Sequence, residues 1–88
     1  MAKKTNSGIM TDLVSLVGEE NAAFIMGVHE NTIYKWTIPT NKKDARVPAI
    51  GTQEKAAGFI CLIEGGTWQI EDILNHVKNA KAKLETYA

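Results

Sequence analysis

A dense group of hydrogen-bonding side chains lies between residues 29 and 35 of this 88-residue chain. Its members are His29, Glu30, Asn31, Thr32, Tyr34 and Lys35. These side-chain types match the exposed edges of DNA bases: an asparagine pairs with adenine, a glutamate accepts from cytosine N4, and a lysine reaches guanine O6 and N7. Thr32 and Tyr34 could touch a thymine methyl group or a phosphate. The group is a candidate for reading bases, and the alternative is a set of ordinary solvated residues on a surface helix.

Positive charge gathers directly after this group. Lys42, Lys43 and Arg46 follow within a stretch whose only acidic residue is Asp44. Cationic side chains that neutralise phosphates supply most of the sequence-independent affinity for DNA. The whole chain, however, has ten Lys and Arg against ten Asp and Glu, a formal net charge of zero, which counts against nucleic-acid binding. The three cations are therefore candidate phosphate contacts, with a solvated basic loop as the alternative.

The surrounding residues predict two short helices joined by a tight turn. In the stretch 19–36, a small residue, Ala23, stands four positions before Gly27. Glycine readily adopts the positive φ that such a turn requires, and Ala23 lets the two helix backbones approach. The residues expected to face inward from the second helix are Val28, Ile33 and Trp36. Two helices that cross through a turn of three or four residues form a helix-turn-helix, whose second helix can enter the major groove of DNA.

Hydrophobic periodicity predicts further helices along the chain. The expected helices span approximately residues 9–17, 19–26, 30–36, 52–64 and 68–87. The expected N-caps are Ser7 or Thr11, Thr52 and Thr67. Glycines at 18 and at 65–66 are expected to end the first and fourth helices. The fourth helix is so rich in apolar residues that we expect it at the centre of the core.

Two segments leave alternatives open. Pro39 and Pro48 interrupt helix formation between residues 37 and 48, and this segment is either a basic loop or a short hairpin forming a wing. We prefer the loop because neither flank alternates apolar and polar residues. In the last helix, apolar residues recur at nearly heptad spacing. Its first half is expected to pack on the domain, whereas the half from Lys78 onward is expected to lie free or to pair with a second copy.

The composition argues against most catalytic and metal-binding functions. Cys61 is the only cysteine, so it forms no intramolecular disulfide, and its apolar surroundings predict a buried, inert thiol. His29 and His76 are too few and too far apart to indicate a metal site. No nucleophile stands with a base, and no apolar run is long enough to span a membrane. We therefore expect no enzyme, no metal or other cofactor, no small-molecule substrate, no membrane partner, and a cytoplasmic location.

Particular residues give the chain a resemblance to a known family. They are Ala23, Gly27-Val28, Ile33 and Lys35-Trp36, then Arg46-Val47-Pro48-Ala49, Ile63-Glu64-Gly65-Gly66 and Glu71-Asp72-Ile73. Over roughly residues 10 to 75 the chain resembles the small helix-turn-helix repressors of bacteriophages and prophages, the Cro and lambda-repressor-like group. The segment between Trp36 and Val47 is longer than is usual in that group. The resemblance implies a sequence-specific DNA-binding regulator, usually dimeric, that acts at pseudo-palindromic sites in a phage genetic switch.

The expected fold is therefore all-α: a compact helix-turn-helix domain of four to five helices, lambda-repressor-like, with a longer C-terminal helix. Residues 1–8 are expected to be a disordered arm, 9–75 the DNA-binding domain and 76–88 a helical extension. The expected function is that of a phage or prophage repressor, as a homodimer or cooperative oligomer on a double-stranded DNA operator in the bacterial cytoplasm, associated with the nucleoid. One alternative is an excisionase or DNA-bending factor assisting recombination. Another is a protein-interaction module that does not bind DNA.

Overall fold

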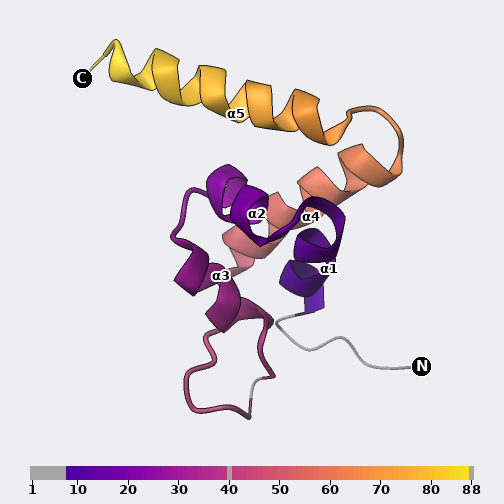
Figure 1. The fold of residues 1–88 in the computed structure, drawn as a ribbon, viewed down its shortest axis with the longest axis vertical. Helices are drawn as coiled ribbons and strands as arrows, with labels where there is room; N and C mark the ends of the chain where they lie inside the picture. Colours follow the sequence, from indigo (N-terminus) through magenta and orange to yellow (C-terminus); the bar gives the residue numbers. More distant parts are fainter. Residues whose placement is uncertain (1–7, 40, 88) are drawn as a thin grey trace.

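The computed structural model describes residues 8–39 and 41–87, and in that part of the chain it contains helices and no strand. The helices are α1 (Gly8–Val17), α2 (Glu19–Met26), α3 (Glu30–Thr37), α4 (Ile50–Glu64) and α5 (Ile70–Glu85). Figure 1 shows α1 to α4 as a helical body, with α5 lying across one end of it and the loop between α3 and α4 projecting from the other. The predicted all-α class is confirmed. Of the expected N-terminal arm, residues 1–7 lie outside the described residues, and Gly8 already begins α1.

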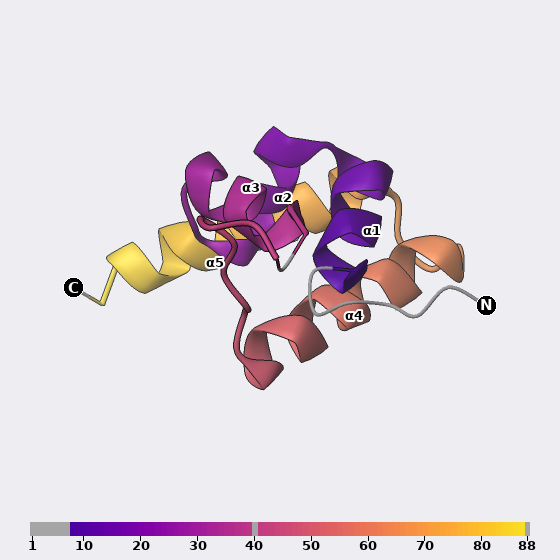
Figure 2. The same cartoon turned by 90° about the horizontal axis from the view of Figure 1, so that it is seen from below.

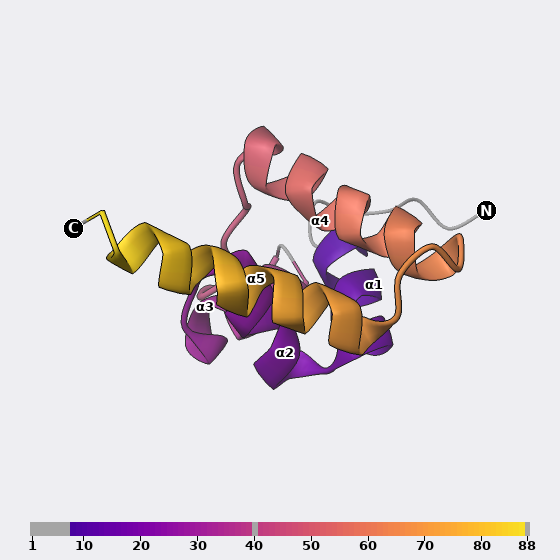
Figure 3. The same ribbon diagram turned by 90° about the horizontal axis from the view of Figure 1, so that it is seen from above.

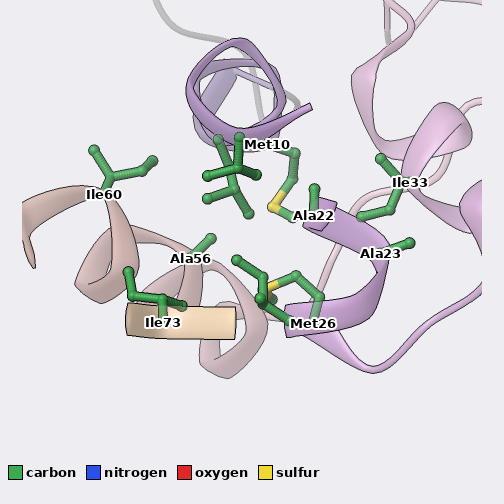
Figure 4. Close-up of a cluster of buried hydrophobic side chains, with 11 residues drawn as sticks. Met10, Ala22, Ala23, Met26, Ile33, Ala56, Ile60 and Ile73 are labelled. Carbon is green, nitrogen blue, oxygen red and sulfur yellow. The ribbon is translucent and has the colours of Figure 1, made fainter. Parts of the chain in front are cut away.

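The core forms where the inward faces of all five helices meet. In α1, Met10, Leu13 and Val17 are buried at a spacing of three and four residues, which places them on one helical face. The whole buried cluster consists of Met10, Leu13, Val17, Ala22, Ala23, Ile25, Met26, Ile33, Ala56, Ile60 and Ile73. Figure 4 shows these side chains converging from α1, α2, α3, α4 and α5. The core therefore holds the two helices of the predicted helix-turn-helix against the other three.

The fourth helix is less central than its composition predicted. Only Ala56 and Ile60 of α4 are buried, because α4 presents a single face to α1 and α2. Cys61 follows Ile60 by about 100° around the helix and is exposed, so the prediction of a buried thiol is wrong. The helix is apolar nearly all round, and such a sequence does not reveal which of its faces is covered.

Three of the predicted N-caps are also corrected. Thr11 lies inside α1, and Ser7 lies outside the described residues. Helix α4 starts two residues before Thr52, and the N–H of Gln53 already donates to the carbonyl of Ala49 at 3.0 Å. Thr67 does not cap α5, whose N-cap is Gln69; the N–H of Thr67 donates to Leu62 O at 3.1 Å and so closes the turn that ends α4.

The start of α5 is set instead by a pair of residues after that turn. Gln69 is the N-cap, and its backbone N–H donates to the carboxylate of Asp72 at 2.9 Å. Acids in a first turn also interact favourably with the helix dipole.

In the described part of the chain, none of the helices has the length and apolar character that a membrane-spanning segment requires.

Helix α5 packs chiefly on α2, at the end of the molecule opposite the loop that follows α3 (Figure 1). Seen from above in Figure 3, it runs in front of α2 and beside α4. Ile73 is buried in the core. The half from Lys78 onward was expected to lie free or to pair with a second copy, and of this half Lys81 reaches back to Phe24 of α2. Beyond that contact, Leu84 is 70% exposed and Tyr87 is 75% exposed.

Candidate nucleic-acid interface

The turn between α2 and α3 has the geometry that the sequence predicted. Gly27 has a φ of 73°, and its N–H donates to Phe24 O at 3.2 Å. The N–H of Val28 donates to Ala23 O at 3.0 Å. These two bonds form the Schellman motif, which satisfies the last carbonyls of a helix and reverses the chain direction. A Cβ at Gly27 would meet nothing within 4 Å, so glycine is required there for its backbone conformation rather than for space.

His29 is the residue at which the turn becomes α3. Its Nδ1 accepts a hydrogen bond from the N–H of Asn31 at 3.0 Å, so the imidazole is the N-cap of the helix. A neutral ring that accepts at Nδ1 carries its proton on Nε2. The exposed His29 can therefore donate from Nε2, and purine N7, guanine O6 and phosphate oxygens are acceptors for such a donor. Histidine is not among the usual N-cap residues, which is why sequence reasoning found its hydrogen-bonding chemistry and missed its structural role.

Replacement of His29 should separate these two roles. His29→Ala removes the cap and is expected to destabilise the protein by about 0.5–2 kcal/mol. His29→Asn keeps a capping oxygen and should lose much less, because asparagine is a preferred N-cap. Urea unfolding of both variants measures the difference. Equal losses in the two variants would show that the ring does not act as the cap.

The position of Ile33, which points into the core, shows which face of α3 is directed outward. Ile33 is fully buried in the core. Asn31 and Lys35 lie two positions before and after it, each about 200° around the helix, so both lie on the side away from the core. They are four residues apart and therefore neighbours on one face. Asn31 is exposed and Lys35 half-buried.

The other predicted base contacts lie beside this face. Tyr34 is 51% exposed and flanks the face on one side, whereas the half-buried Thr32 flanks it on the other. Glu30 is exposed in the first turn of α3. A carboxylate at that position stabilises the helix through its dipole, and this structural role is an alternative to the contact with cytosine. The inward residues behave as predicted: Ile33 is buried, and Val28 and Trp36 pack partly buried against the core.

The basic loop is held against the end of α3 by its backbone. The N–H of Arg46 donates to the carbonyl of Lys35 at 3.1 Å, which brings the loop back beside the end of α3. Within the loop, Lys42 N–H donates to Pro39 O at 3.0 Å and Ala45 N–H to Lys42 O at 3.2 Å. No side-chain pattern in the sequence predicts this hydrogen bond between the loop and α3. In Figure 2, the view from below, the loop lies in front of the helical body, next to α3.

The cations of this loop are accessible to a ligand. Lys42, Lys43 and Arg46 are all exposed. One guanidinium N–H of Arg46 donates to Ala45 O at 2.9 Å, a bond that occupies one of its five donors. In the described part of the loop there is no strand, so the preference for a loop over a hairpin is confirmed for those residues. Thr40, which the hairpin alternative included, lies outside them.

Cations outnumber acids on this surface: Lys35, Lys42, Lys43 and Arg46 stand against Glu30 and Asp44. The acidic pairs Glu19-Glu20 and Glu71-Asp72 stand at the starts of α2 and α5, whereas the end of α3 and the loop carry the cations. This excess of cations gives a local positive surface to a chain of zero net charge. Searched over the described residues, the His, Cys, Asp and Glu side chains form no group of three that could hold a metal ion.

No protein-family model, no curated protein and no solved structure matches this chain.

Proposed function

We propose that this protein is a sequence-specific DNA-binding regulator of a phage or prophage, acting as a repressor that occupies promoter DNA. The observation that carries the proposal is the shared surface of α3 and the basic loop. There, Asn31 and Lys35 face away from the buried Ile33, and the Arg46 N–H bond to Lys35 O holds the loop cations beside them. Phosphate contacts from the loop would position the protein, and the outer face of α3 would read bases.

A gel-shift titration against the genomic DNA flanking the gene tests this proposal. We expect a specific shift that survives competition by unrelated DNA, and bands consistent with a homodimer on one pseudo-palindromic site or with cooperative filling of several sites. Light scattering of the free protein would give its oligomeric state. If no specific shift occurs even at low salt, where electrostatic binding is strongest, the proposal fails.

Asn31 is the residue most suited to a specific base contact. Its amide can form paired hydrogen bonds with adenine N6 and N7. Asn31→Ala is therefore expected to reduce discrimination at one base position by about 1–3 kcal/mol, while binding to unrelated DNA stays nearly unchanged. Selection of bound sequences from a random pool, carried out with both proteins, measures the change.

Asn79→Ala is a matched control for that selection, because it truncates the same neutral side chain at an exposed position on α5. Selected sequences that are identical for Asn31→Ala and the unchanged protein would show that Asn31 reads no base.

The alternative role as an excisionase or DNA-bending factor has less support. A wing made by residues 37–50 would favour it, and no strand is present in the described part of that segment. We therefore retain repression as the proposed function.

A further inference from the structure

One groove, whose lining includes Gly27 of the turn before α3, contains none of the residues proposed to contact DNA. It lies between α5, α2 and α4, with a volume of about 320 Å³. Its apolar walls come from Ile25, Phe59, Val77 and Leu84, and its basic lining from Lys55 and Lys81. Among the described residues that line it, none is acidic. The groove thus combines apolar contact area with positive charge.

One wall of the groove is an apolar stripe of α5, formed by Val77, Ala80 and Leu84. Along α5, Ile73, Val77, Ala80 and Leu84 repeat at intervals of four, three and four residues, so they lie on one face. Exposure rises along this stripe from 1% at Ile73 to 70% at Leu84. The covered half packs on α2, and the uncovered half forms one wall of the groove. An elongated occupant of the groove would therefore lie along this stripe.

The charge of this surface indicates what the occupant is. The C-terminal half of α5 carries Lys78, Lys81 and Lys83 against one acid, Glu85. The charge of Lys81 is held in place, because its ammonium group lies 4.1 Å from the centre of the Phe24 ring and 3.3 Å from Phe24 O. A second copy of this chain bound through the same face would bring the same lysines to both sides of the interface. A partner that carries carboxylates would bring the opposite charge.

We infer that this groove binds an acidic amphipathic helix of another protein, with apolar residues seated against Phe59 and Leu84 and carboxylates beside Lys55 and Lys81. Helices that place an apolar face in a groove are a common mode of recognition. The inference does not depend on DNA binding. Because α5 lies at the opposite end of the molecule from the loop that follows α3 (Figure 1), the protein could hold both ligands at once.

Two synthetic helical peptides test the inference on the full chain. Both have leucine at the same i, i+3, i+4 and i+7 positions; one carries glutamate at its polar positions and the other carries lysine. Titration of each peptide into ¹⁵N-labelled protein, followed by amide chemical shifts, gives the affinity and the surface. We expect the glutamate peptide to bind and to shift the signals of Ile25, Phe59 and Leu84. Equal or tighter binding of the lysine peptide, or no binding of the glutamate peptide, would overturn the proposal.

Single substitutions locate the site on the groove. Leu84→Ala is expected to weaken the glutamate peptide about tenfold, since it removes apolar area from the contact. Ile50→Ala is the matched control, because Ile50 is 67% exposed and does not line this groove. Lys55→Glu is expected to weaken binding by about two- to fivefold more than Lys78→Glu, which is outside the lining.

The same variants also test whether the peptide binds elsewhere and whether a second copy occupies the groove. Equal effects of Leu84→Ala and Ile50→Ala would place the peptide elsewhere and refute the assignment. Light scattering of the free chain tests the competing occupant: a dimer that dissociates on Leu84→Ala would show that the groove holds a second copy. Circular dichroism of each variant verifies that its helices are intact, as expected for exposed positions.

Discussion

Ile33→Ala is expected to lower the free energy of unfolding by about 2–5 kcal/mol, the range for truncating a large buried aliphatic side chain. Ile33 is the only buried residue of α3, and its side chain is 0% exposed. The substitution removes apolar contact and leaves a cavity between α3 and the rest of the core. Small domains are stable by about 5–15 kcal/mol in total, so this single change removes a large part of the stability.

The same chemical change at Ile50 provides the control. Ile50 is 67% exposed at the first turn of α4, and Ile50→Ala is expected to alter stability by no more than about 0.5 kcal/mol. Urea denaturation followed by circular dichroism measures both variants. If the two losses are similar, Ile33 does not face the core, and the assignment of Asn31 and Lys35 to the outer face of α3 fails with it.

Ile33→Val extends this comparison to function. Removal of one methylene group should cost about 0.5–1.5 kcal/mol, which leaves the domain folded. The variant is expected to keep the DNA preference of the unchanged protein, because the outer face of α3 is intact. Loss of binding by a folded Ile33→Val protein would mean that the placement of α3 depends on this one contact.

The helix-turn-helix was predictable because its determinants are local. Gly27 has to supply a positive φ, and the spacing of Ala23, Ile33 and Trp36 identifies the faces that meet. Both signals act over a few residues of sequence, where backbone sterics and helical periodicity dominate. The same local reasoning placed Asn31 and Lys35 on an outward face.

Features that depend on distant contacts were not predictable. Cys61 was expected inside because its neighbours are apolar, but the exposed side of α4 is decided by where α1 and α2 pack. Thr67 resembled a cap for α5 and instead closes the turn after α4 through Leu62 O. The bond from Arg46 N–H to Lys35 O joins two backbone groups that are eleven residues apart, and no side-chain pattern in the sequence indicates it.

The second large effect is expected on DNA affinity and its salt dependence, from substitutions in the basic loop. Replacing both Lys42 and Lys43 with alanine is expected to weaken binding to all DNA sequences by a similar factor. The slope of log K against log salt should become shallower by up to about two units, one for each lost phosphate contact. Both side chains are exposed, so the substitutions should leave stability nearly unchanged. Fluorescence anisotropy with labelled DNA at several salt concentrations measures the slope.

A double substitution on α5 distinguishes phosphate contact by the loop lysines from a general effect of lowering the positive charge of the protein. Lys78→Ala with Lys83→Ala removes the same two charges from exposed positions at the opposite end of the molecule (Figure 1). Because salt screens charges beyond about 10 Å at 0.1 M, this variant is expected to keep the salt slope of the unchanged protein. If it flattens the slope as much as the loop variant does, α5 contacts the phosphates and the proposed surface of α3 and its loop is wrong. If neither variant alters the slope, the lysines of the loop do not contact the DNA backbone, and any affinity must come from α3 itself.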